Sequence, residues 1–235
     1  MDPHRSPASV TIMEVAARAG VSRSTVSRVV NGGESVSPEA LAAVKQAIAE
    51  LNYVPNRAAR SLASRQTLAV GLVVPEDTQR FFGDPFFASI VSGIHHRLMR
   101  SDYVLNLFIA SDEPGTGTGE KLTSYIRGGN IDGAIIVSHH TSDRFVDHIA
   151  SSVPVVYGGR PIRWTQNDYF VDADNVGGSR CAGEYLIGQG RTRIATITGL
   201  STMPAAVDRL AGFERAMAAA GLRPAGVADG RFTAD

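Results

Sequence analysis

Cysteine is nearly absent from the 235-residue chain, which has only Cys181. A single cysteine excludes a disulfide within the chain and a metal site built from several cysteines. The sequence also has no run of the ~20 apolar residues that a membrane span needs, and its start, MDPHRSPAS, lacks the apolar segment of a signal peptide. These absences predict a cytoplasmic protein. With 43% hydrophobic residues, the chain is long enough for a core and for more than one domain.

Net charge is also missing, because 23 basic and 23 acidic side chains cancel. The two signs are unevenly distributed: residues 1–66 hold eight Lys and Arg against five acidic residues, whereas the remainder holds 15 against 18. A basic head on a slightly acidic body indicates an anionic partner for the head. Random scatter of a few charges is the alternative reading of this feature taken alone.

The sequence from 11 to 51 has the pattern of three short helices. In TIMEVAARAG, Thr11 and Glu14 have the spacing of a capping box, and Gly20 ends the helix. Ser22 caps the second helix after a tight glycine turn, as in a helix-turn-helix. A third helix begins at SPEA. Its predicted buried stripe consists of Leu41, Val44, Ile48 and Leu51.

The second predicted helix lies in VSRSTVSRVVNG, residues 21–32, and is rich in mediocre helix formers. With its valines turned toward the core, the outward side chains are Arg23, Ser24, Ser27 and Arg28. A recognition helix places its N-terminal residues in the major groove, where arginine binds guanine and hydroxyls hold phosphates. This face therefore predicts a DNA-binding surface. A helical hairpin with a merely solvated face is the alternative.

The segment LNYVPNRAARSLASRQT, residues 51–67, is also basic. Pro55 ends the third helix, and RAARSLA has the length of two helical turns, which are marginal in water. Leu62 has no place in the three-helix core. A short helix that orders on DNA and inserts an apolar wedge into the minor groove accounts for both features, whereas a flexible linker is the alternative.

Residues 10–67 resemble the head of LacI/GalR-family transcription repressors, with the A-G-V-S-x-x-T-V-S-R-V-x-N core and the Y-x-P-N-x-x-A-x-x-L hinge both present. The resemblance extends through almost the whole chain. It implies a repressor that binds double-stranded operator DNA as a homodimer, with Arg23, Ser24 and Arg28 reading bases. The other DNA-contacting residues that it implies are Thr11, Ser22, Thr25, Ser27 and Asn31 in the head, and Asn56, Arg57, Ala59 and Leu62 in the hinge.

From Leu68 onward, short apolar runs alternate with helical stretches. LAVGLVV, YVLNLFI, GAIIV and PVVY are typical of strands, and the segments between them are typical of helices. This alternation predicts a parallel α/β sheet covered on both faces, with ligands binding at the carboxyl ends of its strands. After VDADN a second unit begins, with a helix over 176–188, the strand RIATITG and a helix from Ala205 to Ala220.

The predicted fold is thus an all-α helix-turn-helix head followed by a parallel α/β body, which the resemblance likens to periplasmic binding proteins. Because one strand cannot bury the helices of the second unit, we expect an incomplete second lobe, in a fragment or a truncated gene product. The expected domains are the head (1–54), the hinge helix and linker (55–66), the first effector-binding lobe (67–172) and the beginning of the second lobe (173–235).

Candidate effector-binding residues lie in loops after the predicted strands. In RFFGDPFF, residues 80–87, aromatic faces have a position from which they can stack on a sugar ring, although aromatic residues are more often core. The resemblance singles out the arginine of DRLAGF, because the family's R-x-x-G-[FY] arginine reaches effector hydroxyls. Capping of the helix at 176–188 is by itself a sufficient role for Asp174. The candidates are Phe86, Phe87, Ser138, Arg160, Asp174 and Arg209.

The effector class follows from a weaker likeness. EDTQRFFGDPFF, VYGGRP and YFVDADNVGG resemble the cello-oligosaccharide-responsive repressors more than the lactose or purine branches. Gly159 stands where many relatives have a sugar-binding aspartate, and this change enlarges the cleft in favour of a disaccharide. A small sugar, cellobiose or a related oligosaccharide, is therefore the implied effector. A sugar-binding protein or sugar enzyme with the same body is the alternative, but it has no use for residues 10–63.

No catalytic residues, metal site or cofactor are predicted, and the protein is not expected to be an enzyme. His95-His96 and His139-His140 are adjacent pairs whose side chains point in different directions, so neither forms a two-histidine metal face. Cys181 is expected on the inner side of an apolar helix, with no base beside it.

Overall fold

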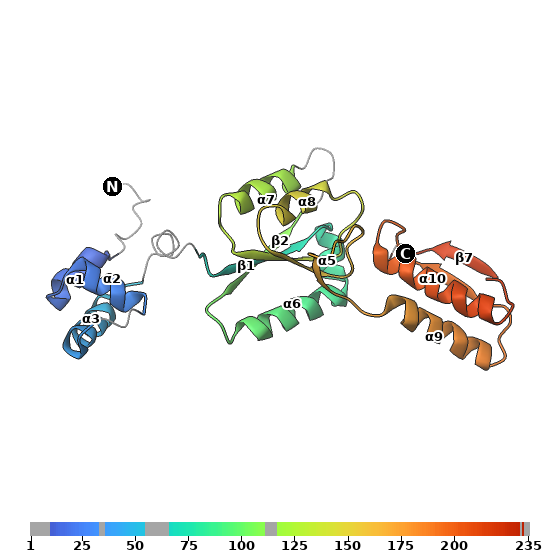
Figure 1. Cartoon of the computed structure of the whole chain (residues 1–235), viewed down its shortest axis with the longest axis horizontal. Helices are drawn as coiled ribbons and strands as arrows, with labels where there is room; N and C mark the ends of the chain where they lie inside the picture. Colours follow the sequence, from blue (N-terminus) through green and yellow to red (C-terminus); the bar gives the residue numbers. More distant parts are fainter. Residues whose placement is uncertain (1–9, 33–35, 55–65, 111–116, 231, 233–235) are drawn as a thin grey trace. The chain divides into compact units, whose positions relative to one another are not determined.

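The computed structural model describes residues 10–32, 36–54, 66–110, 117–230 and 232. The chain divides into two compact units, Met1–Thr67 and Leu68–Asp235, whose helices and strands are labelled in Figure 1. Within the described ranges, no helix combines the length and the apolar composition that crossing a membrane requires.

The described residues of the first unit form α1 (Ile12–Ala19), α2 (Arg23–Val30) and α3 (Pro38–Leu51). The predicted capping box is confirmed: Glu14 N donates to Thr11 Oγ1 at 3.3 Å, and Thr11 N donates to Glu14 Oε2 at 2.6 Å. Gly20 ends α1 with a φ of 66°, a left-handed conformation that favours glycine. The predicted cap Ser22 is also confirmed, and Ser37, the first residue of SPEA, caps α3, so the caps and the glycine turn fix where these helices begin and end.

The core of the first unit takes one fully buried valine from each helix: Val15, Val26 and Val44. The predicted stripe on α3 is wrong at Leu41, which is 36% exposed. At eight residues each, α1 and α2 are about 12 Å long, against about 21 Å for the 14 residues of α3. The two short helices therefore leave the first turn of α3 uncovered.

In the second unit, the described residues of the first half form a parallel sheet with the strand order β2-β1-β3-β4-β5. This confirms the predicted α/β body. On one face lie α7 and α8, and on the other lie α5 and α6 (Figure 1). The elements are β1 (Ala69–Val74), α5 (Thr78–Gly83), α6 (Pro85–Leu98), β2 (Val104–Ile109), α7 (Thr118–Arg127), β3 (Gly133–Val137), α8 (Arg144–Ala150), β4 (Val155–Gly158) and β5 (Tyr169–Val171).

The two faces of this sheet have separate cores because side chains alternate along each strand. From β1, Val73 joins Ile126 and Ile149 of α7 and α8 on one face. Leu72 and Val74 join Phe81 and Phe87 of α5 and α6 on the other. Both cores consist of fully or nearly fully buried side chains, so they hold β1 in place. The position of the residues that follow its carboxyl end is thereby fixed.

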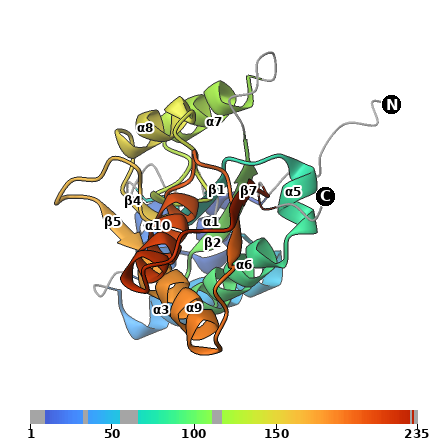
Figure 2. The same cartoon turned by 90° about the vertical axis from the view of Figure 1, so that its right-hand side faces the viewer.

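The rest of the unit contains α9 (Asn175–Gly188), β6 (Ala195–Thr198), α10 (Pro204–Ala219) and β7 (Gly226–Asp229), with β6 and β7 parallel. In both views α9 and α10 lie side by side (Figures 1 and 2). The helices approach closely at Gly212, where an added Cβ would lie 2.2 Å from the carbonyl oxygen of Val176. Gly183 is similarly close to Ala216. Small residues therefore set the distance between these helices.

Several expectations were wrong in this unit. Residues 78–83 form a helical turn, α5, where a loop was expected, because Asp77 caps it by accepting from Arg80 N at 2.8 Å. The short strands β5 and β7 were not predicted. Cys181 is exposed rather than inward, because it lies two residues from Gly183, which faces α10, and two residues span more than half a helical turn. Among the described residues, no cluster of potential metal ligands is found.

Candidate functional site

The first unit presents a cationic face on α2, with Arg23 in the first turn and Arg28 in the last. Arg23, Ser24 and Arg28 are exposed, whereas Val26 on the opposite side is fully buried. The first turn of α2 has no acidic residue. Free backbone N–H groups give the N-terminus of α2 a partial positive charge, to which Arg23 adds. The face therefore suits an extended anionic ligand, with the arginine side chains projecting from a rigid base.

A cluster of hydroxyl groups occupies the same end of the helix. Ser22 Oγ accepts from Thr25 N at 3.2 Å and lies 2.7 Å from Ser24 Oγ and 2.9 Å from Thr25 Oγ1. At the other end, Asn31 Nδ2 donates to Ser27 Oγ at 3.4 Å. Hydroxyls beside a helix N-terminus form a suitable site for a phosphate oxygen.

Thr11 lies at the N-terminus of α1. Its hydroxyl donates to Glu14 Oε2 at 2.9 Å. The backbone N–H of Thr11, and then its hydroxyl, lower the pKa of Glu14, so this carboxylate stays ionised. Thr11 is thus held by the capping box. The remaining predicted DNA contacts, Asn56, Arg57, Ala59 and Leu62, lie outside the described residues.

The second unit contains a cavity of about 800 Å³, lined by the carboxyl ends of β3, β4 and β5, by one side of α6 and by the beginning of α10. Small-molecule pockets commonly have volumes of ~300–1,000 Å³, and in sheets of this kind they lie at the carboxyl ends of strands. Of the predicted effector residues, the lining includes Phe86, Phe87, Ser138, Arg160 and Arg209. Residues from distant parts of the sequence are thus brought together at one hollow.

The phenylalanines of the segment 80–87 are divided between core and surface. Phe81 and Phe87 are buried in the core beneath α5 and α6, and Phe87 is only 2% exposed. Phe86 is 49% exposed and Phe82 is 77% exposed. Consecutive residues on a helix point in different directions, so Phe86 has a free ring face at the cavity while Phe87 supports it from the core, with 5.3 Å between their centroids.

Arg160 follows β4, and both its side chain and its backbone N–H bind carboxylates. Its guanidinium makes an ion pair with Asp208 of α10, and its backbone N–H donates to Asp172 Oδ2 at 2.8 Å. The preceding Gly159 has a φ of 109°, which strains any residue with a side chain, although an added Cβ would meet nothing within 4 Å. This backbone turn aims Arg160 at α10.

Arg209 is held by a second polar chain. Its Nε donates to Asn175 Oδ1 at 2.8 Å, and Asn175 Nδ2 donates to Asp172 Oδ1 at 3.0 Å. The Arg209 guanidinium also lies 5.7 Å from the centroid of the Phe232 ring. Asp174, the remaining candidate, accepts from Gly177 N at 2.8 Å and caps α9. The cavity wall beside it is formed by its neighbours in the segment 172–175.

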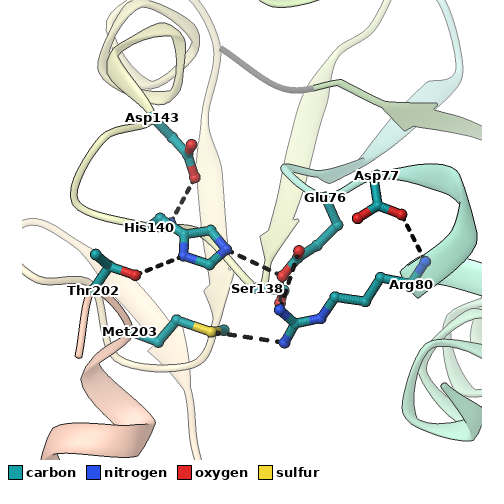
Figure 3. Close-up of polar contacts among 8 residues, drawn as sticks. All are labelled: Glu76, Asp77, Arg80, Ser138, His140, Asp143, Thr202 and Met203. Carbon is teal, nitrogen blue, oxygen red and sulfur yellow. Dashed lines mark hydrogen bonds and ion pairs between the residues drawn. The ribbon is translucent and has the colours of Figure 1, made fainter. Parts of the chain in front are cut away.

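Glu76 is the centre of a buried polar cluster beside the cavity. Its Oε1 accepts from Ser138 Oγ at 2.5 Å and lies 3.2 Å from His140 Nε2, and its Oε2 lies 3.4 Å from Arg80 Nη1 (Figure 3). His140 Nδ1 lies 2.9 Å from Thr202 Oγ1, between β6 and α10. The cluster therefore joins the ends of β1 and β3 to the segment before α10.

His139 is buried, with its ring centroid 5.3 Å from that of Tyr157. Burial, and then the neighbouring His140, lower the pKa of His139, so its ring is neutral. Burial also raises the pKa of Tyr157. His139 lines the cavity as a neutral donor and acceptor.

Several residues of the cavity region were missed in the sequence. Glu76 and Arg80 follow the first strand, and their position after a strand end is the signal that could have identified them. Asp208 precedes the predicted Arg209, but nothing in the sequence shows that it binds Arg160. Phe232 lies beyond the last predicted helix and carried no recognisable pattern.

Comparison with known proteins assigns both units. Residues 11–56 match the model of bacterial regulatory proteins of the lacI family, and residues 67–231 match periplasmic binding proteins and the sugar binding domain of the LacI family. The HTH-type transcriptional regulator CelR of Thermobifida fusca is 45% identical over 224 residues, 94% of this chain and 64% of CelR. The HTH-type transcriptional regulator MalR of Streptococcus pneumoniae (strain ATCC BAA-334 / TIGR4) is 36% identical, over 88% of this chain and 62% of MalR.

Solved structures give the same result. A CelR–cellobiose complex matches with a TM-score of 0.65 at 42% identity, over 95% of this chain and 66% of that one. A lac repressor dimer bound to operator and the anti-inducer ONPF matches with a TM-score of 0.77 at 26% identity, over 96% and 67%. The chain spans less than two thirds of the length of the two curated relatives. The match of the second model over more than half of the chain shows that this protein belongs to the LacI family.

Proposed function

We propose that the chain is a transcriptional repressor that binds operator DNA through its head and responds to a small sugar in the cavity. The observation that carries this proposal is the exposed cationic face of α2, on a capped helix-turn-helix, in the same chain as an effector-sized cavity. The head spans residues 1–54, the hinge helix and linker 55–66, and the effector-binding body the remainder, with lobes divided near residue 172.

In this proposal Arg23, Ser24 and Arg28 read base edges in the major groove. Arginine makes bidentate hydrogen bonds to guanine, and the buried Val26 fixes the direction from which the side chains reach the groove. The hydroxyl cluster and the helix N-terminus support the assignment of phosphate contacts to Thr11, Ser22, Thr25, Ser27 and Asn31. Minor-groove contacts of Asn56, Arg57, Ala59 and Leu62 remain a prediction from the sequence.

The effector assigned to the cavity is cellobiose or a related oligosaccharide. A transcriptional regulator CelR that is 42% identical to this chain has been solved in complex with cellobiose, and the curated CelR of Thermobifida fusca is 45% identical. The cavity combines an apolar wall with a few placed polar groups, as sugar-sized ligands require. Phe86 offers a ring face, and Ser138, Arg160 and Arg209 offer polar groups. Phe87 acts as the support of Phe86, and Asp174 acts through the cap of α9.

We further propose that the repressor is a cytoplasmic homodimer, as one lac repressor relative was solved as a dimer on its operator. Two copies of the head would then read the two halves of a palindromic site. The sugar releases DNA only if it binds the DNA-competent and DNA-incompetent arrangements with different affinities.

A sugar-binding protein or sugar enzyme is the competing function that the body alone permits. Binding of the 235-residue chain to duplexes from a random library distinguishes the two. The proposal predicts that one palindromic sequence is enriched and that millimolar cellobiose releases this DNA from the protein. If only unrelated sequences are recovered at all salt concentrations, the proposed sequence-specific repressor function is contradicted. If one sequence is enriched but no neutral sugar releases it, only the proposed sugar response is contradicted.

A further inference from the structure

The two parts of the second unit, β1 to β5 and α9 to β7, have separate hydrophobic cores. In the part of the chain that the structure describes, the clusters of the first part contain no residue beyond Tyr157, and the cluster of the second part contains none before Ile187. Polar contacts beside the cavity join the two parts. Such contacts exchange their partners for water when they break, so they contribute little net free energy and open reversibly.

Glu76 is the origin of two arms that cross from the first part to the second (Figure 3). In one arm, Glu76 Oε1 lies 3.2 Å from His140 Nε2, and His140 Nδ1 lies 2.9 Å from Thr202 Oγ1. In the other arm, Glu76 Oε2 lies 3.4 Å from Arg80 Nη1, and Arg80 Nη2 donates to Met203 Sδ at 3.8 Å. One carboxylate therefore orients both arms, which end on adjacent residues just before α10.

Thr202 is held by its backbone as well as by its side chain. A carboxylate paired with an arginine only accepts, so His140 Nε2 carries the hydrogen that faces Glu76. In a neutral ring Nδ1 then accepts, and the Thr202 hydroxyl donates to it. Beside this bond, Thr141 N donates to Thr202 O at 3.2 Å. The loop after β3 and the segment before α10 are thus joined by two neighbouring hydrogen bonds.

The first arm lies outside the cavity lining, to which Glu76, His140 and Thr202 do not belong. A molecule in the cavity therefore does not replace this arm, and the arm needs no such molecule to form. Glu76 is also buried, at 7% exposed, so its carboxylate regains water when the arms break. This gain offsets part of the cost of opening.

We propose that Glu76 is the centre of a latch that holds the start of α10 against the carboxyl ends of β1 and β3 with no ligand bound. The two parts separate as bodies when the latch and the Arg160–Asp208 pair break together. Glu76 is a positioning residue, because it acts through His140 and Arg80. The latch sets the fraction of chains with a closed cavity, and the apparent affinity for any cavity ligand falls with that fraction.

The test is hydrogen exchange in the full 235-residue chain, without DNA or sugar. The Thr141 amide is the reporter, because its bond to Thr202 O crosses from one part to the other. The Asp143 amide donates to His140 O at 3.2 Å within a single loop, so it reports fraying of that loop alone.

Three variants weaken different contacts. Thr202→Val keeps the size of the side chain and the backbone bond but removes the hydroxyl of one arm. Glu76→Gln removes the charge that orients both arms. Asp208→Asn weakens the other bridge, and the described bonds of Asp208 go to Arg160, not to the loop after β3. Ser201→Ala is the matched control, since it removes an exposed hydroxyl from the residue before Thr202.

Thr202→Val is expected to raise the exchange rate of the Thr141 amide about fivefold, and Glu76→Gln about tenfold, because they weaken one arm and two arms. Asp208→Asn should raise the same rate about threefold, although its bond lies elsewhere, because the parts separate only when both bridges break. The Asp143 rate should stay at the wild-type value in every variant. Ser201→Ala should change neither rate.

An unchanged Thr141 rate in Thr202→Val would overturn the latch, and so would equal acceleration of the Asp143 amide. A Thr141 rate that responds to Thr202→Val but not to Asp208→Asn would overturn the separation of the two parts as bodies. If Glu76→Gln does not fold, Thr202→Val and Asp208→Asn decide the outcome. Failure of the proposed repressor function leaves this test unaffected, since neither DNA nor sugar takes part in it.

Discussion

The guanidinium of Arg160 makes three hydrogen bonds to the carboxylate of Asp208, from Nη2 at 2.9 Å to each oxygen and from Nε at 3.2 Å. Arg160 follows β4, and Asp208 lies on α10, so the pair bridges one side of the cavity. Glu76, His140 and Thr202 form a second bridge between the same two parts of the unit (Figure 3). The cavity is therefore bounded by polar contacts that join both of its walls.

Asp208→Asn should weaken this bridge because the charge-assisted bonds are lost. We expect the free energy of unfolding to fall by about 1 kcal/mol, since the pair is partly exposed. Urea unfolding of Asp208→Asn, Arg160→Met and the double variant gives the coupling energy. Strictly additive effects would show that the pair contributes nothing.

Ser22→Ala should destabilise α2 by about 1 kcal/mol, because Ser22 Oγ is the cap of Thr25 N. Hydrogen exchange of the Thr25 amide in the whole chain measures the effect. Ser24→Ala is the matched control, since its hydroxyl contacts Ser22 but caps no backbone group in the hydrogen bonds described. Equal acceleration of exchange in both variants would contradict the capping role.

Gly212→Ala should destabilise the second unit by about 1–3 kcal/mol, because its Cβ would collide with the Val176 carbonyl and force α9 and α10 apart. Gly178→Ala, on α9, is the control. An added Cβ meets nothing there, so alanine should stabilise the helix by about 0.5–1 kcal/mol. Thermal unfolding distinguishes the two, and equal melting temperatures would refute the close approach.

The helices of the head could be predicted because their signals are local. The Thr11–Glu14 box, the Gly20 stop and the Ser22 and Ser37 caps each lie within four residues of the backbone groups that they bind. Strand β5 was missed because the three residues of YFV are too few for a period to be recognised, and β7 because GVAD has a single branched apolar residue. Strands β4 and β6 also have only four residues each, but they lie in the longer apolar stretches PVVY and RIATITG.

The cavity was predicted only in outline. Position after a strand indicated Ser138 and Arg160, since parallel strands end at one edge of the sheet. The partners of these residues could not be predicted, because Glu76 precedes Ser138 by 62 residues and Arg160 precedes Asp208 by 48. Such pairings follow from how helices and loops fold over the sheet, and no local pattern encodes them.

His139 gives the second unit a defined dependence of stability on pH. Burial lowers the pKa of His139 below its ordinary value of 6.5, so unfolding takes up a proton at mildly acidic pH. Its contribution is complete above pH 6.5 and is lost as the pH falls through the lowered pKa. The wild type should therefore lose more stability than His139→Phe between about pH 7.5 and 5 in urea unfolding. Parallel losses would contradict a buried neutral histidine.

The central claim is that α2 reads a specific DNA sequence, and the most direct test compares specific with non-specific DNA binding of Arg28→Ala. On the duplex selected by the wild type, this variant should lose about 1–3 kcal/mol of discrimination at one base pair. Arg18→Ala is the control, because Arg18 lies on α1 in an ion pair with Glu50. Competition titrations against non-specific DNA give the ratio of the two affinities. The account predicts that the ratio falls for Arg28→Ala and holds for Arg18→Ala. An unchanged ratio for Arg28→Ala would show that α2 does not read the operator through Arg28.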